Sequence, residues 1–415
     1  MIQGLDTPVE LKLKLIPMLQ HMHHDASQAS CSRELLQELV SSYPSTPMLI
    51  VTLHTFTQLA TSSLVDIPEQ IRLLLQYLKE DPRKAVKRLA IQDLKLLAKK
   101  APHLWTKKNI QVLCECALST PYNSLKLGML SVLSTLSGTI AIKQYFSPNT
   151  GEAPPAPRHT DLVKLAQECC YHSNLAVAAH GITVLTSIAV SCPEKEVIQL
   201  EQETVMGMES LILLCSQDDS KTAQETLKTA LTSLVKMLKS CPHLSQSSVE
   251  LLLAQLHCAC DSARVLMCQA LAAIATQQPV LAEGMLGDLL DLFRVASHRT
   301  SEKQQELLVS LATVLFVASQ ASLSAEGCHD FSRELYQSLR TRVASEHFYF
   351  WLNSLMEFSQ AEQCLSGLSD GDYSAAMSAI SEALKSYQKG IASLTAASTP
   401  LSPLSFQCEF VNACG

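Results

Sequence analysis

Apolar residues recur along this chain in a short pattern whose spacing fits one face of an α-helix. Four positions, spaced four, four and three residues apart, carry mostly apolar side chains in seven separate segments. At about 3.6 residues per turn, this spacing places four side chains on one narrow strip of a helix. The seven strips begin at Leu11, Met48, Val86, Leu125, Val177, Ala223 and Ala263. The pattern therefore predicts seven amphipathic helices.

The distance between these strips predicts how the helices are organised. Their starts lie 37, 38, 39, 52, 46 and 40 residues apart. A helix pair that repeats about every forty residues is typical of HEAT and armadillo solenoids. Thr52 and Gly181 interrupt two of the strips, so the prediction rests on the series. We therefore predict an all-α fold, with a HEAT/armadillo-like helical-repeat solenoid over residues 1–322 and a partner helix before each strip.

Composition changes mark the borders of this array. Residues 147–160 carry four prolines and a glycine, which predicts an exposed loop between repeats and explains the long 52-residue interval. Residues 323–330 read as a short irregular junction. Residues 331–395 are aromatic and rich in Ala and Ser at helical spacing, which favours a smaller tetratricopeptide-like helical region. A tail containing Pro and Ser follows over residues 396–415.

Composition restricts the class of protein. The chain is 47% hydrophobic and only 5% aromatic, with 13 glycines and a net charge of −7. This is a helix-forming mixture, too apolar for general disorder, and its charge does not indicate a nucleic-acid binder. No apolar run reaches the ~18 residues of a membrane span, so no membrane association is predicted. The 15 cysteines lie mainly inside helical patterns, which favours free thiols in the cytosol or nucleus.

Cysteine and histidine are numerous enough to be tested as metal ligands. Cys114 with Cys116, and Cys258 with Cys260, form C-x-C pairs that point about 200° apart on a helix and cannot share a metal. The His21–His24 cluster ends the first strip, where imidazoles can bind exposed helix carbonyls. Nucleotide-binding, hydrolase and zinc-protease motifs do not occur in the sequence. We predict no catalytic residue, no metal, no cofactor and no small-molecule substrate.

One segment departs from the overall acidic balance. Residues 79–108 hold ten basic side chains against three acidic ones. Six of them form the candidate contact ridge for a partner or for phosphate groups: Lys84, Lys87, Arg88, Lys95, Lys99 and Lys100.

Helical geometry gathers part of this ridge on one side. Lys84, Arg88, Lys95 and Lys99 fall within about 60° of each other, opposite the apolar strip. Such a surface could meet nucleic-acid phosphates or an acidic protein segment, and a merely solvated outer face is an equal alternative. Aromatic side chains are not interleaved, apart from Trp105 at the edge, so any nucleic-acid binding would be non-specific.

Long stretches of the chain also resemble a known family. They are QGLDTPVELKLKLIPMLQHMHHDA (3–26), IRLLLQYLKEDPRKAVKRLAIQDLKLLAKK (71–100), LKLGMLSVLSTLSGTIAIKQYFS (125–147), ASEHFYFWLNSLMEFSQAEQCL (344–365) and KGIASLTAASTPLSPLSFQCEFV (389–411). They closely resemble the Integrator complex subunit 7 family.

The resemblance carries expectations about function. It implies a non-catalytic scaffold subunit of the nuclear Integrator complex, which processes small nuclear RNA 3′ ends and regulates and terminates transcription by RNA polymerase II. It also implies a link to DNA-damage checkpoint signalling. The expected partners are other Integrator subunits and, indirectly, the RNA polymerase II machinery. The expected location is the nucleus, with chromosome-associated and cytoplasmic pools as further options.

The resemblance also implies a shortened form. Members of the family begin upstream of Met1, continue past Gly415 and carry extra residues where SAEGCHDFS stands here. A truncated or alternatively spliced chain is therefore expected. Two other functions remain open from the residues alone. One is an adaptor that contacts nucleic acid through the basic ridge, and the other is a transport or membrane-coat adaptor of similar fold.

Overall fold

The computed structural model describes most of the chain and shows helices throughout. It describes residues 7–42, 45–146, 160–191, 197–297, 302–321, 346–366 and 373–397. Every regular element in these ranges is an α-helix or a 3-10 helix, which confirms the all-α prediction. The chain divides into two compact units, Met1–Leu211 and Ile212–Gly415.

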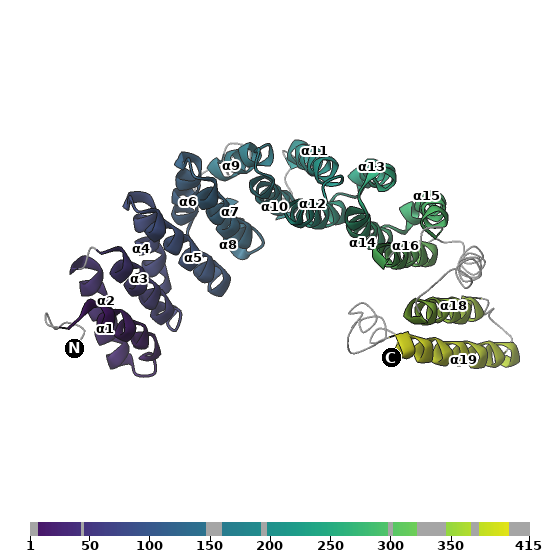
Figure 1. Ribbon diagram of the computed structural model, residues 1–415, viewed down its shortest axis with the longest axis horizontal. Coiled ribbons are helices and arrows are strands. Elements are labelled where there is room, and N and C mark those ends of the chain that lie inside the picture. The colour runs from purple at the N-terminus through teal and green to yellow at the C-terminus, as the bar shows by residue number, and fades with distance from the viewer. Residues whose placement is uncertain are drawn as a thin grey trace. The chain divides into compact units, whose positions relative to one another are not determined.

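The first unit is a succession of helical hairpins. Its helices are α1 (Val9–Leu15), the 3-10 helix η1 (Ile16–His21), α2 (Ala26–Ser42), α3 (Thr46–Ala60), α4 (Ile67–Glu80), α5 (Lys84–Lys100), the 3-10 helix η2 (Pro102–Leu104), α6 (Lys107–Ser119), α7 (Asn123–Ser137), α8 (Ile140–Phe146), α9 (Asp161–Cys170) and α10 (Leu175–Ser191). Helices α3, α5, α7 and α10 pack side by side in that order, and α4, α6 and α9 form a second layer (Figure 1). This two-layer stacking is the arrangement of HEAT and armadillo repeats.

The predicted strips occupy the interior of this stack. In α5, Val86, Ala90, Leu94 and Leu97 have no exposed surface. In α7, the four strip residues that start at Leu125 are at most 3% exposed. Hydrophobic burial on both sides of each strip helix therefore holds neighbouring hairpins together.

The second unit repeats the same arrangement. It contains α12 (Lys221–Ser240), α13 (Ser245–Cys258), α14 (Asp261–Gln277), α15 (Pro279–Ser297), α16 (Glu302–Ala321), α18 (Glu346–Ser366) and α19 (Tyr373–Ala397), while α11 (Val197–Cys215) spans the boundary. Helices α12, α14 and α16 pack in one layer, and α13 packs against α15. Helix α16 packs against α15 and α14.

The C-terminal described region is a hairpin of long helices. Helices α18 and α19 pack along each other, with the ring of Phe358 beside Gly390. This confirms a smaller helical region after the repeats. The Pro-rich segment 147–160 lies outside the described residues except for Thr160, whose hydroxyl caps α9. The junction 323–330 and residues 398–415 also lie outside them, so the domain borders stay predictions.

The first predicted strip is wrong. Helix α1 ends at Leu15, and η1 continues from Ile16 with Pro17 in its first turn. Proline lacks the N–H that a continuing α-helix needs, and the change of helix type rotates the buried face. The strip residues Leu11 and Met22 are 42% and 41% exposed, while Ile16 is buried.

Gly181 interrupts its apolar strip in the sequence, but in the structure it allows two helices to pack closely. A Cβ atom at this position would lie 2.9 Å from the Cβ of Cys169 and 3.0 Å from the carbonyl oxygen of Ala166. Helices α9 and α10 therefore approach so closely that no side chain fits between them. The residue that interrupts the apolar strip is the residue that permits this packing.

We predict that Gly181→Ala destabilises the protein by about 1–3 kcal/mol, because the added methyl group overpacks the α9–α10 contact. Thermal unfolding monitored by circular dichroism would show a lower transition temperature. Gly284→Ala is the matched control, since Gly284 lies within α15 and a Cβ there meets nothing within 4 Å. It should stabilise by roughly 0.5–1 kcal/mol. Equal effects of both substitutions would contradict the packing argument.

Candidate interaction surface

A hydrogen-bonded turn between α4 and α5 lies near the start of the basic segment. Both oxygens of Asp81 are bound by Arg83: Oδ1 accepts from the backbone N–H at 2.8 Å and Oδ2 from the guanidinium Nη2 at 2.6 Å. The side-chain hydrogen bond from Arg83 lowers the pKa of Asp81, so the carboxylate of Asp81 stays ionised. One of the ten basic side chains is therefore neutralised within the turn.

The structure places four ridge residues along one side of α5. Lys84, Arg88 and Lys99 are exposed, and Lys95 is half-buried. This side borders α7. The Nζ atom of Lys84 lies 4.5 Å from the centre of the Tyr122 ring, and Lys95 donates a hydrogen bond to Ser131.

The other two predicted ridge residues lie elsewhere on the helix. Lys100 is exposed, about 160° around the helix axis from Lys84. Lys87 is half-buried and lines a cavity between two hairpins. The six residues therefore do not form one continuous surface.

Neighbouring groups compensate part of the remaining charge. Lys79 forms an ion pair with Glu115 at 3.4 Å, and Lys107 lies 5.9 Å from the centre of the Tyr145 ring. Trp105, which the sequence placed at the edge of the ridge, is only 2% exposed and belongs to the core. It therefore offers no stacking surface for a base.

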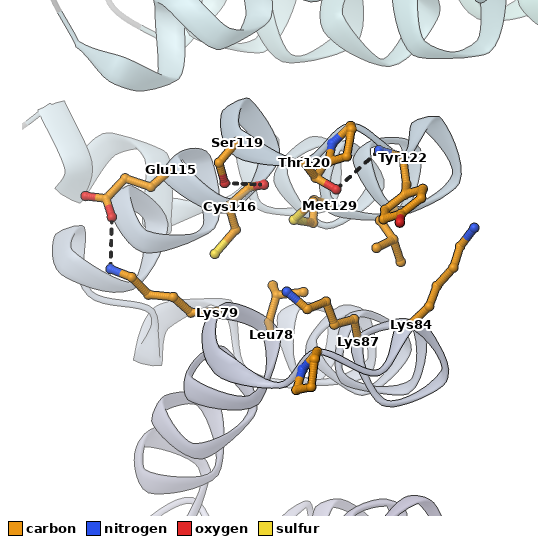
Figure 2. A pocket seen from close by; sticks show the side chains of 13 residues that line it. Leu78, Lys79, Lys84, Lys87, Glu115, Cys116, Ser119, Thr120, Tyr122 and Met129 are labelled. Atoms are coloured by element: carbon orange, nitrogen blue, oxygen red, sulfur yellow. Dashed lines mark hydrogen bonds and ion pairs between the residues drawn. The ribbon is translucent and has the colours of Figure 1, made fainter. Parts of the chain in front are cut away.

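The cavity beside Lys87 was not foreseen from the sequence. It has a volume of about 430 Å³ and lies where the α4–α5 and α6–α7 turns face each other (Figure 2). Its lining residues are Leu78, Lys79, Pro82, Lys84, Lys87, Glu115, Cys116, Ser119, Thr120, Pro121, Tyr122, Leu125 and Met129. A volume of this size falls in the range of small-ligand and side-chain pockets.

The cavity has charged groups at both ends and one further lysine, Lys87, between them. The Lys79–Glu115 ion pair closes one end, and Lys84 stands beside Tyr122 at the other (Figure 2). Between them Lys87 reaches toward the centre, where Cys116 lies on the opposite wall.

A second unforeseen feature links α3 to α5. His54 Nδ1 lies 2.8 Å from Asp93 Oδ1, and the side chain of Asp93 is only 1% exposed. The hydrogen bond to Asp93 raises the pKa of His54 above its ordinary value of 6.5. The two residues are 39 positions apart, so the pair ties one repeat to the next.

The cysteines of the described helices are mainly packing groups. Burial raises the pKa of the thiols of Cys114 and Cys116, and it raises the pKa of Cys169 to about 11 and of Cys170 to about 12. These groups stay neutral thiols near neutral pH, whereas nucleophiles and metal ligands require the thiolate. This agrees with the free thiols expected from their positions in helical patterns.

The described histidines and acidic groups form no cluster suited to a metal. Within the described ranges, no three His, Cys, Asp or Glu side chains converge. In the N-terminal histidine cluster, His23 Nδ1 lies 3.0 Å from the carbonyl oxygen of Gln20. The expected binding of a helix-end carbonyl is therefore confirmed for this residue.

No single described helix has both the length and the apolar content needed to cross a bilayer. Helices α7 and α8 reach this length and apolar content only when taken together, and they are bent by 90° relative to each other.

Comparison with known proteins identifies the family. The family model "Integrator complex subunit 7, N-terminal" matches residues 1–352. The chain belongs to the Integrator complex subunit 7 family. A second model, "Integrator complex subunit 7 helical bundle", matches residues 329–413.

Members of the Integrator complex subunit 7 family match along almost the whole chain. The subunit from Danio rerio is 88% identical and the one from Homo sapiens 67% identical, each over 99% of this chain and 46% of the relative. The subunit from Drosophila melanogaster is 24% identical over 99% of this chain and 48% of the relative. The chain thus spans about half the length of these relatives. The 439-position vertebrate alignments exceed its 415 residues, so those relatives hold residues with no counterpart here.

Solved structures confirm the fold class. An importin beta structure aligns with a TM-score of 0.56 at 11% identity, covering 95% of this chain and 57% of that chain. Yeast importin-beta (Kap95p) aligns with a TM-score of 0.57 at 12% identity, covering 94% and 52%. At such low identity the likeness concerns the helical-repeat fold alone.

We predict that the His54–Asp93 pair makes stability depend on pH. Because the folded state raises the pKa of His54, the protonated imidazole stabilises the fold below the unfolded value of 6.5. This contribution is lost as the pH rises through the folded pKa. The difference in melting temperature between wild type and His54→Gln should therefore be largest near about pH 5.5 and shrink toward about pH 8.

The matched control for this experiment is His103→Gln, which alters an exposed histidine near the start of α6. Its melting temperature should follow that of the wild type across the same pH range. A His54→Gln difference that is constant with pH would show that the imidazole charge does not contribute.

Proposed function

We propose that the chain is a non-catalytic scaffold within the Integrator complex, with other Integrator subunits as its binding partners. The observation that carries this proposal is the match of the family model to residues 1–352. The stacked hairpins of both units agree with it, because helical-repeat arrays offer long surfaces to large protein partners.

The chain would support small nuclear RNA 3′-end processing and regulation and termination of transcription by RNA polymerase II, which it would contact indirectly. It would act in the nucleus, including on chromosomes, with a cytoplasmic pool and a further role in DNA-damage checkpoint signalling. The raised thiol pKa values favour a binding role over nucleophilic chemistry.

Affinity purification tests the scaffold proposal. The tagged chain, expressed in human or fish cells, should co-purify from nuclear extract with other Integrator subunits detected by mass spectrometry. A tagged full-length relative, purified in parallel, shows which subunits depend on the part of the relatives beyond this chain. Recovery of the short chain solely as a free monomer, beside successful recovery with the full-length protein, would contradict the proposal. The purified chain should also lack RNA cleavage and phosphatase activity.

A second candidate function is non-specific nucleic-acid binding through the ridge on α5. The observation that favours it is that Arg88 and Lys99 are exposed and form no hydrogen bond or ion pair within the described residues. A transport or membrane-coat adaptor would share the fold, but no feature of the described surface favours that function. Localisation imaging would distinguish such an adaptor from a nuclear scaffold.

We predict a steep salt dependence if the ridge binds phosphates. Electrophoretic mobility shifts with a labelled single-stranded RNA should then weaken as salt rises, and Arg88→Glu with Lys99→Glu should remove most of the affinity. Adding Lys84→Glu and Lys95→Glu should abolish it. Wild-type protein that binds RNA without salt sensitivity, or not at all, would eliminate this candidate.

A further inference from the structure

The cavity between the α4–α5 and α6–α7 turns contains a lysine, Lys87, whose ammonium group is available to bind an anion. Lys87 is half-buried, and no hydrogen bond or ion pair joins it to another described residue. The carboxylate of Asp81 lies within the electrostatic influence of Lys87. However, both oxygens of Asp81 are already bound by Arg83. A half-buried ammonium group in such a position favours an anion brought by a ligand.

The other charged groups of the cavity are already engaged. Lys79 pairs with Glu115, and Lys84 lies over the face of Tyr122. The lining holds three lysines against one glutamate, so the cavity is positive in a protein whose net charge is −7. This local sign selects an acidic partner and disfavours a basic one.

The wall beside Lys87 is suited to an apolar side chain. Leu125 and Met129 come from α7, Cys116 comes from α6, and Pro82 and Pro121 stand in the two turns. The prolines restrict the backbone of both turns, so the cavity is formed before any partner arrives. A preformed cavity reduces the entropy cost of binding.

We propose that this cavity anchors an acidic segment of a partner protein. A carboxylate of that segment binds the ammonium group of Lys87, and a neighbouring apolar side chain enters beside Leu125 and Met129. The inference rests on the scaffold role proposed above and places one of the contacts with a partner protein in this cavity. A nucleic acid fits the cavity less well, because one face of Tyr122 is covered by Lys84 and the remaining aromatic groups are not within the lining.

A peptide-binding assay on the purified full chain tests the proposal directly. The probe is a fluorescein-labelled peptide of alternating Glu and Asp with one central Leu, followed by fluorescence anisotropy. Lys87→Glu should weaken its affinity by about tenfold or more, because the anchoring charge is reversed. Lys87→Met retains the aliphatic stem and should weaken binding in the same direction, which covers the case in which the glutamate disturbs packing. Lys100→Glu, on the same helix but outside the cavity, is the charge-matched control and should change affinity less than about twofold.

The outcomes separate the cavity from the other hypotheses. Equal weakening by Lys87→Glu and Lys100→Glu would overturn the proposal, since it would indicate general charge attraction. Unchanged binding in both Lys87 variants, or absence of binding by the wild type, would also overturn it. Displacement of the peptide by poly-uridine RNA at equal charge concentration would assign the site to nucleic acid instead. The assay needs no other Integrator subunit, so its result is independent of whether the chain co-purifies with the complex.

Discussion

Each hairpin of this protein carries more apolar surface than its own two helices can cover, and the excess is buried against the hairpins on either side. Helix α5 illustrates the constraint, since it packs on α4 within its hairpin and on α3 and α7 in the neighbouring ones. The spacing between hairpins is therefore fixed by the strips that begin at Val86 and Leu125. The cavity beside Lys87 and the ion pair between His54 and Asp93 both lie at joints set by that spacing.

The repeats were predictable because periodicity reports burial directly. A helix that stays packed along its length must keep apolar residues recurring on one face. Six of the seven predicted strips lie in packed helices. The first strip failed because Pro17 changes the helix type, and spacing alone cannot register that change. From the sequence, Gly181 looked like a defect in its strip. Its importance comes from the close approach of Cys169 and Ala166, which the sequence does not show.

The interaction surface was predictable only as far as it belongs to one helix. Helical geometry brought Lys84, Arg88, Lys95 and Lys99 to one side of α5, and the structure places them there. The cavity is lined by Lys87 and by Cys116 and Tyr122 from the following hairpin. The sequence does not show the distance between residues of different hairpins. The sequence also could not show that Arg83 binds both carboxylate oxygens of Asp81 and leaves Lys87 available.

Polar links between hairpins share a regular separation along the chain. Ser216 donates to Gln255, 39 residues later, and Gln278 donates to the carbonyl oxygen of Leu238, 40 residues earlier. Closing loops of nearly equal length costs nearly equal entropy at each joint, and all of these contacts are local compared with the length of the chain. Folding can therefore nucleate at any hairpin and propagate to its neighbours. Amide hydrogen exchange should accordingly be governed by stepwise opening of single joints.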